Sequence, residues 1–344
     1  MVVLTVTFFC SSLVANGANQ AHNTNQKDKI VVRLPRSRGR ITLRGTIINY
    51  TGSSILIRSS VNASVKEFPT SSVVKVSTSH VAPYLQGMTF FSQKKYLQAT
   101  RSFEKAIQQE DRKWVRREIL AMLVRCALQA GDDRVASSRF LTLTESDAET
   151  FYFHLIPLQW TPSPLGNLSR LNGLAWLQNK SATTRLLGAS RLLLDEKYGQ
   201  FATTEMKALA TNIDRRIRSY ARMQLWRLEL QHPKKLTKFQ LERWRKEIER
   251  TPSSYRAGGW YLLGMAYSYK REYEQSATAF LWLPLVYDQD KFLAARSCYE
   301  GAESLLQIGK KHEAKILLQE VVKRFGETPA AQEAAIALKK LQQR

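Results

Sequence analysis

Histidine is the side chain most often used for proton transfer and metal binding, and this sequence has five of them, widely separated. None is followed three or four positions later by a second metal-ligand residue, and the acids close to them, such as Glu313 next to His312, are ordinary surface types. The sequence also lacks a phosphate-binding loop, a nucleophile elbow, a zinc-protease helix motif and a dinucleotide-binding loop. It therefore predicts no enzyme, no cofactor and no metal site, and assigns structural or neutral roles to His22, His80, His154, His232 and His312.

Arginine is the second candidate for chemistry, because its guanidinium binds carboxylates and phosphates. Lys and Arg number 52 against 29 Asp and Glu, so the formal net charge of the chain is +23. Two runs of arginine are either solvated surfaces or anion-binding surfaces. Neither run is interleaved with the aromatic residues that stack on nucleic-acid bases. The candidate anion-binding residues are Arg33, Arg36, Arg38, Arg40, Arg215, Arg216, Arg218 and Arg222.

Helices must position most of these side chains. From Val81 to Leu341, stretches of about 12 to 17 residues with helical spacing of apolar positions are separated by short Gly-, Pro-, Asn- or Asp-containing breaks. Such a pattern fits either a helical bundle or a solenoid of stacked helix pairs. Internal repetition in the sequence favours the solenoid.

The repeated pattern combines small residues, which let two helices approach closely, with aromatic residues that fill the gap between them. It occurs at Trp260, Leu263, Gly264, Tyr267, Tyr273, Ser276 and Phe280, and again at Gly87, Phe90, Tyr96, Ala99, Phe103 and Ala106. This frame resembles the tetratricopeptide (TPR) repeat. The resemblance implies pairs of antiparallel helices that stack into a curved array.

Each of these segments is followed by a degenerate copy, in which Gly131 and Gly309 occupy the turn between helices and favour a left-handed backbone there. We therefore expect TPR-like pairs over residues 80–145 and 255–344, the second with a capping helix from Pro329 to Leu341. Residues 146–254 lack the frame and loosely resemble HEAT-type helices, with an independent helical bundle as the alternative. Their prolines predict a hinge or a long inter-helix loop, at Pro157, Pro162 and Pro164.

The first helix of each pair lines the concave side of such an array, so the resemblance implies a groove for a partner. Aromatic, Met and Arg residues are common at interfaces, although neighbouring helices could instead cover them. Some TPR proteins hold a C-terminal carboxylate with Lys and Asn; the Asn positions here are Met88, Arg125 and Met265, which disfavours that activity. The candidate groove residues are Tyr84, Met88, Phe91, Met122, Arg125, Tyr261, Met265, Tyr269, Arg296 and Tyr299.

A small β module precedes the helices. Residues 29–79 alternate in period two, are rich in Val, Ile and Thr, and contain a short turn at Thr51, Gly52 and Ser53. The run GTIINYTGSSILI, followed by Phe68 and Pro69, is similar to the SH3-like and Sm-like small barrels. The similarity implies a closed barrel of four or five short strands.

The first residues are apolar and uncharged before Lys27, which predicts a secretory signal over residues 1–20 and a linker over residues 21–28. The alternatives are a buried first strand or a misassigned start. The apolar run is too short to span a membrane, so the mature chain should be soluble or peripherally attached. Cys126 and Cys298 lie in helical patterns and are interpreted as small buried apolar residues, not as a disulfide or metal pair.

These patterns predict a mainly α fold, an α-solenoid preceded by a small β-barrel. The expected function is a non-enzymatic scaffold or adaptor that binds a protein or peptide in the concave groove, in the periplasm or cell envelope. Its basic faces would contact an anionic envelope component. The alternatives are an RNA-associated protein that uses the Sm-like barrel and the arginines, and an enzyme hidden in the central helices. A secretory start argues against a nucleic-acid partner.

Overall fold

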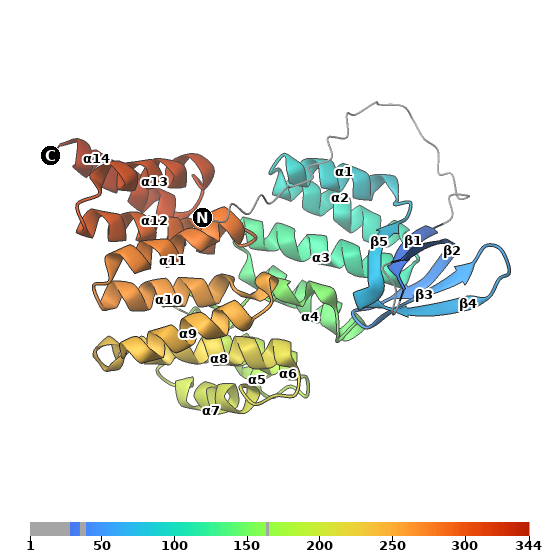
Figure 1. Cartoon of the computed structure of the whole chain (residues 1–344), viewed down its shortest axis with the longest axis horizontal. Coiled ribbons are helices and arrows are strands. Elements are labelled where there is room, and N and C mark those ends of the chain that lie inside the picture. Colours follow the sequence, from blue (N-terminus) through green and yellow to red (C-terminus); the bar gives the residue numbers. More distant parts are fainter. Residues whose placement is uncertain (1–27, 35–38, 163–164, 344) are drawn as a thin grey trace.

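A computed structural model describes residues 28–34, 39–162 and 165–343 (Figure 1). The expected signal, linker and the candidate residues Arg36 and Arg38 lie outside these residues, apart from Asp28 at the end of the linker. The described residues form a small β-sheet followed by fourteen α-helices, which confirms the prediction of a mainly α fold.

The strands are β1 (Asp28–Arg33), β2 (Arg40–Tyr50), β3 (Ser54–Ser59), β4 (Val65–Pro69) and β5 (Val73–Ser77). The helices of the first half are α1 (Ala82–Ser92), α2 (Tyr96–Gln109), α3 (Lys113–Ala130), α4 (Asp133–Ser146), α5 (Asn167–Leu177), α6 (Ala182–Leu192) and α7 (Gly199–Leu209). Those of the second half are α8 (Arg215–Glu229), α9 (Lys238–Arg250), α10 (Ala257–Tyr269), α11 (Tyr273–Val286), α12 (Lys291–Gln307), α13 (Lys311–Arg324) and α14 (Pro329–Gln342).

The five strands form one antiparallel sheet in the order β4-β3-β2-β1-β5. The sheet is open, because its edge strands β4 and β5 do not pair, so the expectation of a closed barrel is wrong. The physical reason lies in the cover of its apolar face. Ile30, Val32 and Ile57 of the sheet share one buried core with Phe103 and Val115 of the helices. Helices bury the face that a barrel would have buried by closing on itself.

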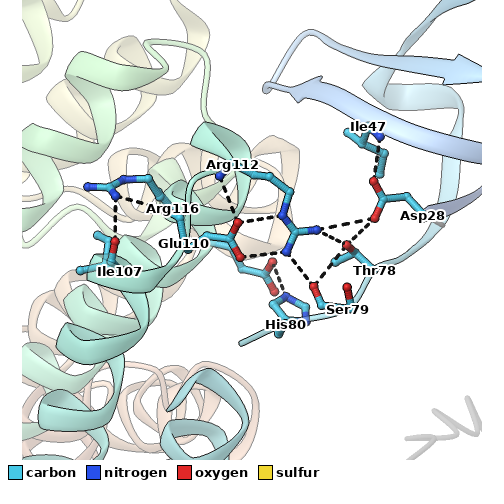
Figure 2. Close-up of polar contacts among 10 residues, drawn as sticks. Asp28, Ile47, Thr78, Ser79, His80, Ile107, Glu110, Arg112 and Arg116 are labelled. Atoms are coloured by element: carbon cyan, nitrogen blue, oxygen red, sulfur yellow. Dashed lines mark hydrogen bonds and ion pairs between the residues drawn. The ribbon is translucent and has the colours of Figure 1, made fainter. Parts of the chain in front are cut away.

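A polar junction also holds the sheet to the helices (Figure 2). The Arg112 guanidinium donates hydrogen bonds to Thr78 Oγ1 and to the Ser79 carbonyl, each at 2.7 Å, and lies 3.7 Å from the Asp28 carboxylate. It also pairs with Glu110 at 2.7 Å. Burial raises the pKa of Glu110, but the hydrogen bonds from Arg112 outweigh that effect and hold it below the usual value. The sheet is thus anchored to the first helices through packing and charge.

The two helix-pair regions repeat one packing contact. A Cβ built at Gly87 of α1 would lie 2.7 Å from the Phe103 ring of α2, and one at Gly264 of α10 would lie 2.7 Å from the Phe280 ring of α11. Each glycine therefore leaves room for an aromatic ring of the next helix. The turns that end α3 and α12 contain Gly131 and Gly309 at φ of 73° and 75°, as the sequence predicts.

The helices stack in succession and the array curves, so that its last part returns toward its first (Figure 1). Gln129 at the end of α3 donates a hydrogen bond at 2.8 Å to the carbonyl of Gln289, just before α12. Residues 156–162 form a non-helical inter-helix connection inside this curve, with Ile156, Leu158 and Trp160 buried, and Pro164 lies outside the described residues. None of the described helices is long and apolar enough to cross a membrane.

Candidate functional site

A cavity of about 600 Å³ lies inside the curve of the array, and we call it the inner cavity. Its wall is formed by the turn between α3 and α4, by residues 158–162, and by helices α10, α12 and α14. Its apolar lining comes from Leu128, Leu158, Trp160, Pro162, Tyr261, Met265, Phe292 and Leu293. Large apolar and aromatic surfaces of this kind suit the side chains of a bound peptide.

The charges of the inner cavity are mostly negative. Its lining contains four carboxylates and one guanidinium, at Asp133, Asp290, Glu300, Glu333 and Arg296. Arg296 is already engaged, since it lies 2.6 Å from the Glu300 carboxylate and 2.8 Å from that of Glu333. A chain with a net charge of +23 thus encloses a cavity with an excess of acid.

Asp290 shows the electrostatic consequence. Its carboxylate caps α12 by accepting hydrogen bonds from the Phe292 and Leu293 N–H groups, each at 3.0 Å. Burial, and to a smaller extent the neighbouring Asp133 carboxylate, nevertheless raise the pKa of Asp290 to about 6. A cation that entered the cavity would stabilise the ionised form of this group.

Side chains of α6 and α8 hold the connection of residues 156–162 through the backbone of Gln159. The Gln159 N–H donates to Ser190 Oγ at 2.9 Å, and Gln224 Nε2 donates to the Gln159 carbonyl at 3.0 Å. Arg227 donates to Gln224 Oε1 and to the Ser190 carbonyl, both at 2.7 Å. The four residues of this network, Gln159, Ser190, Gln224 and Arg227, are all buried or half-buried. The helical array thus holds a non-helical stretch of chain through its main-chain groups.

The predicted groove residues divide among several places. Tyr261, Met265 and Arg296 line the inner cavity, and the half-buried Tyr299 stacks with Arg296. Phe91 and Arg125 line a second cavity of about 640 Å³ between the first and last helix pairs. Tyr84 and Met122 are buried and present no contact surface, whereas Met88 and Tyr269 are exposed.

Tyr261 is also largely buried, with 2% of its surface exposed, and packs against Phe280 at a ring-centroid distance of 5.7 Å. The repeat frame identifies first-helix residues but does not separate those that line a cavity from those that are buried or exposed elsewhere. The carboxylates were missed, because they come from three separate segments, α4, α12 with its N-cap, and α14, and no spacing links them.

Arginines of the second predicted run gather at another place. Arg215, Arg216, Arg218 and Arg222 line a cleft of about 470 Å³ together with Arg243, Lys246 and Arg250 of α9, and we call it the basic cleft. The three α9 residues were missed, although their spacing of three and four places them on one helix face. Arg33 and Arg40 lie opposite each other on β1 and β2, outside this cleft.

The two described cysteines are the remaining candidates for chemistry. Cys126 and Cys298 are free and buried, as predicted, and burial raises their pKa values to about 11 and about 12. Within the described residues, no group of three or more His, Cys, Asp or Glu side chains is arranged to hold a metal ion.

No known family model matches this sequence, and no curated protein is significantly similar to it. The inner cavity and the basic cleft are therefore interpreted from their own geometry.

Proposed function

We propose that this protein is a non-enzymatic scaffold that binds an extended segment of a partner protein in the inner cavity. The carrying observation is that the same curve already holds a non-helical stretch of its own chain, residues 156–162, through the two main-chain hydrogen bonds of Gln159. The inner cavity opens directly beside that stretch, with Trp160 and Pro162 in its wall. The bound peptide would lie next to residues 156–162.

The chemistry of the cavity specifies the partner further. Four carboxylates against one already paired guanidinium favour a peptide that carries Lys or Arg, and the apolar lining favours large aliphatic or aromatic neighbours. The array would exclude an acidic peptide or a C-terminal carboxylate, because Arg296 is held between Glu300 and Glu333. The proposed ligand is thus an extended segment with alternating basic and apolar side chains.

We further assign the two helix-pair regions to the TPR type. The equivalent contacts of Gly87 with Phe103 and of Gly264 with Phe280 support this assignment. Ser276 adds a third equivalence, since its hydroxyl donates to the Gly264 carbonyl at 2.9 Å at the position of Ala99 in the first pair.

A peptide-binding assay tests the proposed function. A fluorescent peptide in which Leu alternates with Lys should bind, and a matched peptide with Glu for Lys should not. The change Glu333→Lys places a cation at the half-exposed rim of the cavity and should weaken binding about tenfold. Glu313→Lys on α13, an exposed acid outside the cavity, is the matched control and should leave binding unchanged. Equal binding of both peptides, or no loss in Glu333→Lys, would contradict the proposal.

The site of action is proposed to be the cell envelope, on the strength of the apolar start of the sequence. Residues 1–30, fused to a reporter enzyme that is active only outside the cytoplasm, should yield an active fusion. An inactive fusion would place the protein in the cytoplasm and bring RNA within its reach.

A further inference from the structure

The basic cleft is built by two neighbouring helices that run side by side. Trp226 of α8 stacks on Trp244 of α9, with ring centroids 4.5 Å apart and planes within 8° of each other. This contact fixes the two helices together. Basic residues then recur on the facing side of each helix at a spacing of three or four, at Arg215, Arg218 and Arg222 of α8 and at Arg243, Lys246 and Arg250 of α9.

The cleft has a large excess of positive charge. Seven basic side chains line it, and Glu247 is the only carboxylate among its lining residues. Glu247 lies 3.7 Å from Arg222 and compensates one cation at most. Arg216 pairs with Asp214, whose carboxylate lies 2.7 Å away, and Lys246 lies 3.8 Å from the Glu242 carboxylate. Arg218 donates to the Asn212 carbonyl at 2.7 Å.

Three of the arginines lack such compensation. Among the described residues, no carboxylate lies within ion-pair distance of Arg215, Arg243 or Arg250. The opposite face of α9 shows what this protein does with an arginine that has only a structural role. There, Arg245 lies 2.7 Å from both Glu242 and Glu249. One helix thus carries a paired arginine on one face and unpaired arginines on the face that lines the cleft.

We propose that the basic cleft is a binding site for a compact ligand with clustered phosphate groups. Arginine forms paired hydrogen bonds with phosphate oxygens, and several arginines around a volume of about 470 Å³ match more than one phosphate. The hydroxyls of Ser219 and Tyr255 also line the cleft and are donors for phosphate oxygens. A bound oligophosphate would relieve the repulsion among cations held close together by the packing of α8 and α9.

The cleft fits a compact anion better than a nucleic-acid strand. Single-stranded RNA is held by a row of exposed aromatic rings on which successive bases stack. Tyr255 is the one aromatic residue in the lining, and its half-buried ring packs edge-on against Tyr220 at 5.4 Å. The cations also surround one volume of about 470 Å³, whereas a nucleic-acid strand requires an extended track.

The test is a calorimetric titration of the full chain with tripolyphosphate at low and at physiological salt. The double change Arg243→Glu and Arg250→Glu alters two exposed side chains that make no ion pair, so the fold should persist. It should weaken binding by roughly 30-fold or more, because two charge-assisted contacts are replaced by repulsion. The matched control is Arg101→Glu with Lys105→Glu on the exposed face of α2, which changes the net charge equally and should alter binding less than about threefold.

Two further probes identify the source of the phosphates. Phosphatidylcholine vesicles with a minor share of phosphatidylinositol bisphosphate test a lipid headgroup, and a single-stranded oligouridine tests RNA. Binding of tripolyphosphate or of the bisphosphate vesicles that is lost in the double variant but kept in the control supports the site, and the stronger of the two names the source. No binding of either, equal binding by the double variant, or tighter binding of oligouridine would overturn the proposal.

Discussion

The inner cavity and the basic cleft are opposites within one chain. In the inner cavity the single arginine is clamped by two carboxylates, and further acids remain around it. In the basic cleft the single carboxylate is outnumbered by seven cations. The net charge of +23 of the whole chain does not predict the local charge of either site. The comparison teaches that a total charge constrains the surroundings of a protein, whereas recognition depends on the local balance between charges and their partners.

The two regions also use arginine differently. Arg227, beside the inner cavity, is buried and donates to an amide oxygen and a carbonyl, and burial lowers its pKa to about 10. Arg250, in the cleft, is exposed and makes no ion pair within the described residues. Arg227 therefore has a structural role in holding the connection of residues 156–162, whereas Arg250 is available to a ligand.

The largest expected effect is a loss of stability when the buried hydrogen bonds of Gln224 are removed. Gln224→Leu removes the donor to the Gln159 carbonyl and the acceptor of Arg227, which leaves buried polar groups without partners. We expect a loss of about 2 to 4 kcal/mol in the free energy of unfolding, measured by chemical denaturation. Arg250→Gln in the cleft should change it by less than about 0.5 kcal/mol. Equal losses in the two variants would show that the regions do not differ in this way.

The next effect is the pH dependence of the inner cavity. The pKa of Asp290 is raised from 3.8 to about 6, so the folded chain binds this proton more tightly than the unfolded chain. Its contribution to stability is therefore present below pH 3.8 and is lost as the pH rises through about 6. Asp290→Asn keeps an acceptor for the N–H groups of α12 and should be more stable than the natural chain at neutral pH by about 1 to 2 kcal/mol.

This gain should vanish as the pH falls toward 4, which a series of thermal or denaturant melts can follow. Asp132→Asn is the matched control, because Asp132 caps α4 by accepting a hydrogen bond from the Val135 N–H at 2.9 Å and lies outside the inner cavity. A gain of the same size and pH dependence in both variants would mean that the cavity itself does not perturb Asp290.

Sequence patterns predicted the parts of this fold that depend on neighbouring residues. The glycine and aromatic frame predicted the close approach of Gly87 to Phe103 and of Gly264 to Phe280, because the two residues of each contact lie within one helical hairpin. Closure of the sheet was predicted wrongly, since its apolar face is covered by helices that follow it in the chain. The first four arginines of the cleft were identified from their run along α8, but the α9 residues and the cavity acids were not. Their proximity arises only when distant segments pack together.

The contact between α3 and α12 has a mechanical consequence. A Cβ at Gly131 would lie 2.5 Å from the Phe292 ring, so the turn after α3 and the start of α12 touch at this glycine without room to spare. Open superhelices stretch like springs when they are pulled, because each unit touches only the next. In this array the contact between Gly131 and Phe292 joins two parts that are distant in sequence. Tension applied to the sheet would therefore pass to the last helices through this contact before any helical hairpin unwinds.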